Sequence, residues 1–442
     1  MTRARGRRFW ATNQGMPLVL LGLCVFFSLM TSADQFPTGA AAARQLSARI
    51  VASGRKGVVI VVREHDDDRV FAAELRALLQ ARAINVLATV RGEPAVVRRE
   101  LSRIGAAGEL VHVFACSPVT AGWNLYEPLR ARFPALAGAA IIKPEPYRWP
   151  NFLKTENLLN IANQIAVIAV IAVGMTLVII TGGIDLSVGS LIALSAVVTA
   201  RLIRDVAGGE SAGALGMTLA SAAGIAVGAA SGVFSGSMVT FCRVPPFIAT
   251  LGMMLVASGL AYIVSDGQSI NQVPGSFVRL GRGVNALGVP HAVVLMFVIY
   301  GAAHLVMSRL VFGRYVYAVG GNPVAARLSG VPVRRVLLKV YALCGALAGL
   351  GGVVMASQLK SGAPTYGQMY ELYVIAAVVV GGTSLSGGEG HIFGTLVGAF
   401  IIAVIQNGMN LMGVESYTQK IVLGLVILGA VLADRWKRDL VR

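Results

Sequence analysis

The feature that most constrains this chain is a series of about ten segments that are apolar over nearly the thickness of a bilayer. A spanning helix needs roughly 20 mainly apolar residues, because the hydrocarbon core offers no water to backbone N–H and C=O groups. Charged residues make up only 13% of the chain, against about 25% in soluble domains. The sequence therefore predicts an α-helical polytopic membrane protein. Its expected transmembrane helices lie near 16–32, 158–180, 184–203, 212–238, 246–264, 291–311, 337–358, 370–382, 391–412 and 417–433.

The eighth segment is too short to cross a membrane as a straight helix. Residues 370–382 cover only about two thirds of the length that a spanning helix needs. The segment either borrows residues from Thr365 onward or forms a re-entrant or broken helix.

Basic residues set the predicted orientation, because Lys and Arg favour short cytoplasmic loops. They gather in three places that ten spans put on one side, so both termini are expected in the cytoplasm. The net charge of +17 then reflects topology and attraction to anionic membrane lipid. No aromatic platform accompanies the basic residues, so no nucleic-acid partner is expected. The residues are Arg3, Arg5, Arg7 and Arg8, then Arg314, Arg327, Arg334, Arg335 and Lys339, and finally Arg435, Lys437, Arg438 and Arg442.

The first apolar segment has two interpretations. A basic start followed by an apolar run and small residues also resembles a secretory signal, but Thr31-Ser32-Ala33 is a poor cleavage site and favours a retained anchor. In both cases the residues after Ser32 lie outside the cytoplasm.

Residues 34–149 lack membrane-length apolar runs and predict a small α/β domain inserted between the first two spans, outside the cytoplasm. Strands are expected at 57–62, 84–90 and 110–115, with helices at 69–82 and 94–104 between them. Alternating strands and helices indicate a parallel sheet. Asp66, Asp67 and Asp68 could bind a cation, but an acidic helix start is the commoner explanation. We assign no chemistry to this domain.

The segment 174–190, GMTLVIITGGIDLSVGS, joins two apolar stretches through a glycine pair and an acid. We expect Gly182 and Gly183 to end one helix, and Asp185 or Ser187 to accept hydrogen bonds from free N–H groups at the start of the next. A second glycine-rich segment holds Gly381, Gly382, Gly387 and Gly388, which suit a tight turn and close helix approach.

Nothing in the chain indicates an enzyme. Residues 385–389, LSGGE, are similar to the signature of ATP-binding cassette ATPases, yet the chain has no phosphate-binding G-x-x-x-x-G-K-[ST] loop. No serine, cysteine or carboxylate pair has a catalytic context, and no Cys or His cluster has metal-ligand spacing. We expect no catalytic residue, no cofactor and no metal.

Polar side chains inside the apolar segments are candidates for a solute path, because each is costly there unless it faces a cavity or a partner. Neutral amides and hydroxyls suit an uncharged, hydroxyl-rich solute. Each residue is equally suited to a hydrogen bond between helices. The candidates are Asn163, Gln164, Thr176, Gln358, Gln406, Asn407 and Asn410.

From about residue 151 to residue 438 the chain resembles the membrane permease subunit of the ribose, xylose and galactoside family of bacterial ABC sugar importers. The matching segments are 150–160, 174–190, 245–253, 313–331 (GRYVYAVGGNPVAARLSGV) and 381–399. The resemblance implies a transmembrane core over 150–434 in the bacterial inner membrane. It also implies a cytoplasmic ATPase, an extracytoplasmic sugar-binding protein and a second permease subunit, which would make a homodimer. The insert departs from the family pattern of a short first loop.

The loop 312–336 has the character of a docking element. Asn322 suits a helix cap and Pro323 the first turn of a short helix that continues through Ala325, Ala326, Arg327 and Leu328 to Gly330. Leu328 and Val331 could enter a groove of a soluble partner, with Arg327 pairing to its carboxylates. By resemblance, this is the coupling helix that receives motion from the ATPase.

Two other functions remain open. A secondary transporter would need an ion-coupling site, for which Asp185 is the one clear candidate near a span. A membrane receptor would use 34–149 as a sensor. The identity of the sugar and the role of the insert do not follow from the sequence.

Overall fold

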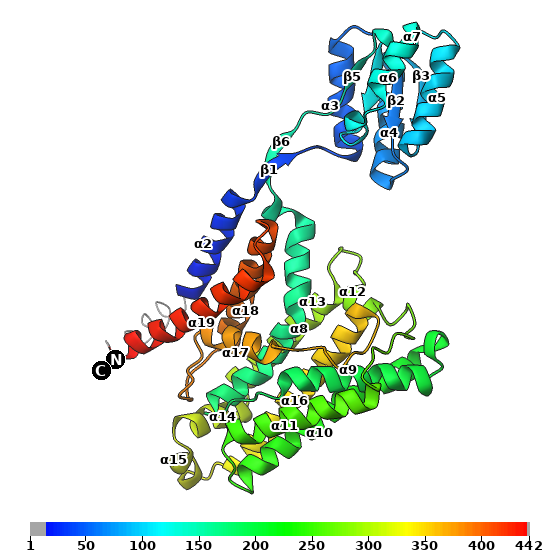
Figure 1. The fold of residues 1–442 in the computed structure, drawn as a ribbon. Coiled ribbons are helices and arrows are strands. Elements are labelled where there is room, and N and C mark those ends of the chain that lie inside the picture. Colours follow the sequence, from blue (N-terminus) through cyan, green and yellow to red (C-terminus); the bar gives the residue numbers. More distant parts are fainter. Residues whose placement is uncertain (1–14, 440–442) are drawn as a thin grey trace. The chain divides into compact units, whose positions relative to one another are not determined.

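A computed structural model describes the backbone of residues 15–439 and the side chains of residues 15–432 (Figure 1). The chain divides into two compact units, one made of residues 1–31 with 151–442 and the other of residues 32–150. The basic residues that the orientation argument places at the two ends of the chain, Arg3, Arg5, Arg7 and Arg8 with Arg435, Lys437, Arg438 and Arg442, lie outside the described side chains.

The first unit is built from helices, and every segment expected to span the membrane is largely helical. Short 3-10 turns and α12 (Arg279–Arg282) lie in the connections. The long helices are α2 (Gly15–Met30), α8 (Thr155–Ile180), α9 (Val188–Asp205), α10 (Ala214–Thr240), α11 (Pro246–Ser265), α13 (His291–Arg309), α14 (Val311–Gly321), α16 (Val333–Leu359), α17 (Tyr370–Val380), α18 (Ile392–Leu411) and α19 (Ser416–Asp439).

Six of these helices, within the described residues, are long and apolar enough to cross a bilayer by themselves: α8, α10, α11, α13, α16 and α18. Three apolar helices are shorter: α2, α17 and the described apolar part of α19. Two helices remain: α14 has 11 residues, and α9 has only 18 residues and ends in Arg201, Arg204 and Asp205. It also begins at Val188 and not at the expected Ile184, because Asp185 and Ser187 form a turn.

Helix α8 lies inside the first unit, where it contacts α13, α16, α17 and α18. In its most apolar stretch, 89% of the residues are buried. A helix that is apolar on all sides is stable only where protein or lipid surrounds it, and here protein does. The glycine-flanked end of α8 is therefore held in a fixed position.

Helices α10 and α16 pack backbone to backbone, and glycines make this possible. A methyl group added at Gly345 would lie 3.0 Å from both Cα and N of Gly232 and would strike the carbonyl of Gly228. A methyl group added at Gly228 would lie 2.9 Å from Cα of Gly349. Backbone thus meets backbone, as small residues permit between membrane helices.

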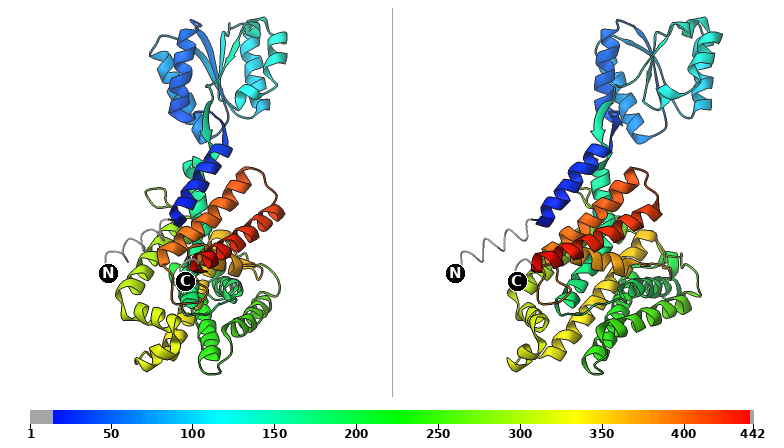
Figure 2. Two further views of the ribbon diagram at one scale, coloured as in Figure 1. Left: turned by 90° about the vertical axis from the view of Figure 1, so that its left-hand side faces the viewer. Right: turned by 60° about the vertical axis from the view of Figure 1, so that its left-hand side comes forward.

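The second unit is a three-layer α/β structure. Its parallel sheet has the strand order β3-β2-β4-β5, formed by β2 (Gly57–Val62), β3 (Asn85–Arg91), β4 (Val113–Cys116) and β5 (Ala140–Ile142). Helices α3 (Gly39–Ala52) and α4 (Asp66–Gln80) cover one face, and α5 (Pro94–Ala106), α6 (Tyr126–Arg132) and α7 (Pro134–Ala137) cover the other (Figure 2). Strands β1 (Ser32–Gln35) and β6 (Tyr147–Pro150) pair antiparallel where the chain enters and leaves the unit.

The elements expected in this region exist, β2 at its expected bounds and the others with shifted ends, and several more were not expected. Strand β4 begins at Val113 and not at 110, and α4 begins at Asp66 because the three aspartates form its first turn. Asp68 is 7% exposed and its Oδ2 accepts hydrogen bonds from the backbone N and Nε of Arg63, both 3.1 Å away. The carboxylate of Asp68 therefore stabilises a loop. Helix α3 was not predicted, because its alanines are only weakly apolar and give no clear helical pattern of hydrophobicity.

Cys116 provides a test of this core, because it is fully buried on β4 whereas Cys242 is exposed. Burial raises the pKa of the Cys116 thiol to about 12, so at pH 8 it stays protonated and unreactive. We expect maleimide to modify Cys242 at least about tenfold faster than Cys116 in the native protein, and both at similar rates in denaturant. Peptide mass spectrometry measures the two rates.

The same thiol also predicts a pH dependence. Its pKa in the folded chain exceeds the value of 9.0 for an exposed thiol, so its burial stabilises the fold below pH 9. That contribution is lost as the pH rises from 9 towards 12. Equal native labelling of both cysteines at pH 8 would contradict this packing of β4.

Candidate functional site

The first glycine pair ends α8 in a left-handed turn. Gly182 has φ +79°, its N–H donates to the carbonyl of Ile179 at 2.9 Å, and the N–H of Gly183 donates to the carbonyl of Val178 at 3.0 Å. This is a Schellman cap, which satisfies carbonyls that the end of the helix leaves free. Asp185 follows, fully buried, and its Oδ1 accepts from N and Oγ of Ser187 at 2.9 and 2.6 Å. The glycine pair thus ends α8 as expected, whereas Asp185 bonds within the turn and α9 has no side-chain cap at its N-terminus.

The second glycine pair repeats this geometry at the end of α17. Gly382 has φ +88°, its N–H donates to Val379 at 2.9 Å, and the N–H of Thr383 donates to Val378 at 3.1 Å. Oγ of Ser384 accepts from N of Ser386 at 3.1 Å, as Asp185 does from Ser187. Each helix therefore ends in a glycine Schellman cap that is followed by a side-chain-to-backbone turn, at Asp185 after α8 and at Ser384 after α17.

These two turns meet each other and α14. The N–H of Gly388 donates to the carbonyl of Ile180, the last residue of α8, at 2.8 Å. A methyl group on Gly320 would lie 2.6 Å from N of Gly388. Gly387, with φ +82°, sits at the same contact, and Oη of Tyr317 donates to the carbonyl of Gly390 at 2.8 Å. Helix α14 is thus packed against both turns through backbone contacts.

Helix α14 leads directly into α15 (Pro323–Leu328), the expected docking helix (Figure 1). Oδ1 of Asn322 accepts from N of Val324 and of Ala325, both at 3.0 Å, which makes it an N-cap, and Pro323 occupies the first turn. Ala326 is buried against the rest of the unit, while Ala325 and Arg327 are exposed. Gly330 ends the segment with φ +83°.

The apolar residues of this segment divide differently from the expectation. Leu328 is 85% exposed and Val324 is 67% exposed, so both are free for a partner. Val331, which we expected in the partner's groove, is only 9% exposed and packs in the core of this chain. The loop 312–336 is therefore mostly helical, and the second exposed apolar side chain beside Leu328 is Val324 and not Val331.

The chain between α16 and α17 re-enters the first unit as a non-helical segment, residues 360–369, which consists mostly of turns. Gly362 exchanges backbone hydrogen bonds with Ile270 at 2.8 and 3.0 Å and lies against Ala196 and Ala200 of α9. Five residues later, Gly367 lies against Gly189 and Ile192 of the same helix. The segment therefore runs about two turns along α9 before α17 begins at Tyr370. Its 11 residues, Tyr370–Val380, make α17 a half helix.

A cavity of about 320 Å³ lies at the N-terminus of this half helix. Helices α9 and α11 and the non-helical segment 360–369 form its walls. The polar residues that line it are Ser190, Ser258, Gln368 and Glu371, beside Tyr366. The carboxylate of Glu371 rests directly on Gly189, where a methyl group would collide with it. The glycine of the V-G-S sequence at 188–190 is thus explained by this cavity.

The sequence did not predict these cavity residues. It indicated Asp185 as the one clear acid near a span. Glu371 could have been predicted as a site residue, because it is an acid at the start of the eighth apolar segment. The other residues gave none, because 361–369 reads as an ordinary loop until its path along α9 is known.

The polar residues expected to line a path mostly bond to other helices. Oγ1 of Thr176 is buried and lies 2.7 Å from Oγ1 of Thr395, and Asn407 exchanges two hydrogen bonds with Asn157 at 2.9 and 3.0 Å. Nε2 of Gln358 donates to the carbonyl of Asn163 at 3.3 Å. Oδ1 of Asn410 accepts from Nε2 of Gln419 at 2.7 Å. Gln164 is exposed and Gln406 half-buried. The structure does not bring these seven residues to one site.

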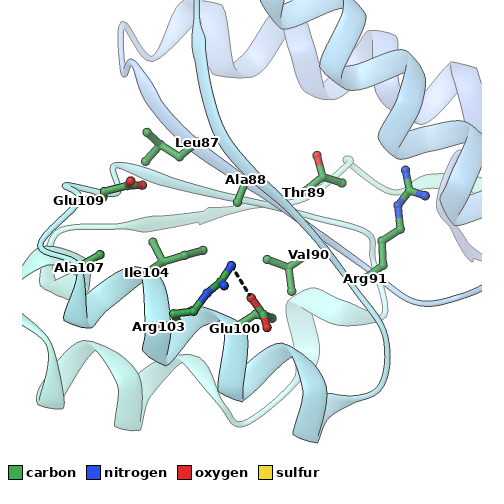
Figure 3. Close-up of a pocket in the computed structure, with 10 residues that line it drawn as sticks. All are labelled: Leu87, Ala88, Thr89, Val90, Arg91, Glu100, Arg103, Ile104, Ala107 and Glu109. Carbon is green, nitrogen blue, oxygen red and sulfur yellow. Dashed lines mark ion pairs between the residues drawn. The ribbon is translucent and has the colours of Figure 1, made fainter.

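The second unit has a larger cavity, about 640 Å³, along the outer edge of β3 (Figure 3). Leu87, Ala88 and Val90 of the strand face Ile104 and Ala107 of α5 across it. Arg103 and Glu100 form an ion pair of 3.1 Å on one wall, and Glu109 lies near Leu87. Arg103 and Glu100 neutralise each other here, and the residues that line this cavity do not form a reactive set of side chains.

A helical unit with several membrane-length helices and a short helix beside a polar cavity fits the class of membrane transport permeases. Over residues 157–431 the chain matches the family described as branched-chain amino acid transport system / permease component, and it belongs to this family.

Named relatives lie within the same region. The chain is 47% identical to the ribose import permease protein RbsC of Escherichia coli (strain K12) over 293 residues, which are 65% of this chain and 88% of that protein. It is 36% identical to the D-allose transport system permease protein AlsC of the same organism, over 64% of this chain and 85% of that protein. It is 37% identical to the fructose import permease protein FrcC of Rhizobium meliloti, over 65% and 80%. No solved structure matches the chain.

Proposed function

We propose that this chain is the permease subunit of an ATP-driven importer and forms the path for a monosaccharide such as ribose. The observation that carries the proposal is its 47% identity to a ribose import permease over most of that protein's length. Allose and fructose permeases in the same region support a sugar as solute. The description of the family names branched-chain amino acids, so these are the competing class of solute.

The partners follow from the exposed coupling helix and from the class of transporter. A cytoplasmic ATPase docks on α15, where Leu328 and Arg327 are exposed. An extracytoplasmic binding protein delivers the sugar, and a second copy of the chain completes the path. The exposed apolar faces of α10, α11 and α13 meet lipid or this second copy.

The topology that fits this function has ten spans, formed by α2, α8, α9, α10, α11, α13, α16, α17, α18 and α19. Both termini and the segment 312–336 are cytoplasmic, in the inner membrane of a bacterium. The region 34–149 is then an insert outside the cytoplasm, between the first span and the core at 150–434. Its absence from the matched region 157–431 supports a role specific to this chain.

Uptake by vesicles tests the proposal. Vesicles holding the chain, its ATPase and its binding protein should take up at least one labelled sugar from a panel of ribose, allose and fructose, only with ATP inside the compartment that holds the ATPase. Leucine serves as the amino acid control. Uptake of leucine and of no sugar would overturn the solute class.

Two other functions give different results in the same assay. A secondary transporter, for which buried Asp185 would be the coupling acid, would accumulate solute from an ion gradient without the ATPase. A receptor using residues 34–149 would bind a ligand with no uptake under any energy source.

A further inference from the structure

The cavity at the start of α17 has the properties of a solute site and not of a packing defect. It is built where the chain is not helical: residues 360–369 run in turns along α9 as far as Gly367, and α17 starts three residues later. Non-helical backbone at membrane depth is tolerated only where protein buries it or where it lines a water-filled cavity. In transport proteins, broken helices mark solute sites near the middle of the bilayer.

The depth of the cavity agrees with such a site. Its residues on α11 are Met254, Leu255 and Ser258, in the middle of the 20-residue helix Pro246–Ser265. On α9 it is lined by Gly189, Ser190 and Ala193, in the first two turns. Leu255 and Met369 in this lining are 67% and 46% exposed, so the cavity opens onto the surface of the first unit.

The side chain of Glu371 indicates which environment the cavity opens onto. Its side chain is half-buried, and among the described groups the favourable partner of its carboxylate is its own backbone N–H. An acid at this depth cannot face lipid, so the opening faces water or a second copy of the chain.

The chemistry of the lining selects the class of solute. A carboxylate with no basic neighbour accepts hydrogen bonds from hydroxyl groups and repels the carboxylate of an amino acid. Ser190, Ser258 and Gln368 add hydroxyl and amide groups, and the hydroxyl of Tyr366 is already bonded to Ser361. A volume of about 320 Å³ is at the small end of ligand sites, which suits one monosaccharide.

We propose that this cavity is a solute-binding station on the transport path, in which Glu371 accepts hydrogen bonds from the hydroxyl groups of one monosaccharide. The inference rests on the importer function proposed above and adds the residues that contact the sugar. Ser190, Ser258 and Gln368 complete the station.

The first test measures water access without transport. All four native cysteines are replaced by alanine, and single cysteines are placed by Ser258→Cys in the cavity and by Val298→Cys on α13, where the side chain is 62% exposed on an apolar face. In native membranes a charged, membrane-impermeant thiol reagent should modify position 258 at least about tenfold faster than position 298, because only thiolates in water react. The panel sugar that the wild type imports fastest should slow labelling at 258 alone. Equal, slow labelling at both positions, or labelling that the sugar leaves unchanged, overturns the proposal.

The second test measures transport. Glu371→Gln keeps the size of the side chain and removes its charge, so uptake of that sugar at low concentration should fall about tenfold or more and the preference among panel sugars should change. Glu210→Gln, at an exposed site outside the cavity, should transport as the wild type does. Gln368→Ala serves as a second variant where Glu371→Gln fails to assemble, as judged by gel filtration. If both cavity variants take up the sugars at the wild-type rates and with the wild-type preferences, the binding station is excluded and the importer function is not. If the wild type takes up no panel sugar, both proposals are excluded.

Discussion

Gly345→Val should abolish uptake and unfold the membrane unit more readily than any other single substitution considered for this chain. The added side chain meets the carbonyl of Gly228 and lies 3.0 Å from backbone atoms of Gly232, so no rotamer relieves the contact. Helices α10 and α16 must separate, which costs about 3 kcal/mol. The apparent melting temperature in detergent should fall by about 5 °C. Thermal unfolding followed by circular dichroism measures the shift.

The control for this substitution is Gly429→Val on α19. Gly429 has nothing within 4 Å of an added methyl group, so the same change there should alter stability by less than about 0.5 kcal/mol. Equal melting temperatures for the two variants would mean that α10 and α16 do not cross at these glycines.

Leu328→Asp should reduce ATP-driven uptake to below about a tenth while leaving the permease folded. Leu328 is 85% exposed at the end of α15, so its replacement costs little within the chain but places a charge in the apolar contact with the ATPase. The consequence should reach the path through α14, whose Gly320 contacts the turns at Gly388 and Ile180. Uptake and co-purification of the ATPase are measured together.

The matched control is Leu287→Asp, because Leu287 is 87% exposed in the connection between α12 and α13, away from α15. It should bind the ATPase and transport normally. Arg327→Glu should weaken the same docking contact through charge. Normal ATPase binding and normal uptake in both Leu328→Asp and Arg327→Glu would exclude α15 as the docking element.

Much of the local structure was predictable, because its causes are local. The turn at Gly182 requires a positive φ that glycine adopts freely, and the cap at Asn322 depends on a side chain two and three residues from its donors. Strand β2 could be predicted from an unbroken apolar run, Gly57–Val62. The membrane segments were predictable for the same reason, since their length and composition are properties of the sequence itself.

Long-range contacts decided the remainder. Thr176 and Asn407 look alike in the sequence as polar residues in apolar segments, yet each bonds to a residue more than 200 positions away. Val331 and Leu328 are both apolar residues next to the docking helix, and only the packing of α14 and α16 buries one and exposes the other. Hydrophobic pattern cannot separate these cases, because burial depends on which helices meet.

The residues alone therefore determined that this chain is a polytopic membrane protein of an import-permease type, with glycine turns and a capped docking helix, since backbone conformation and membrane insertion depend on nearby residues. The tertiary structure alone decided where a solute site could be. It placed Ser190, Ser258 and Glu371, from three separate helices, around one cavity, because the non-helical segment after α16 folds back along α9. No spacing in the sequence specifies that path, which depends on the fit of Gly362 and Gly367 against a helix about 170 residues earlier in the chain.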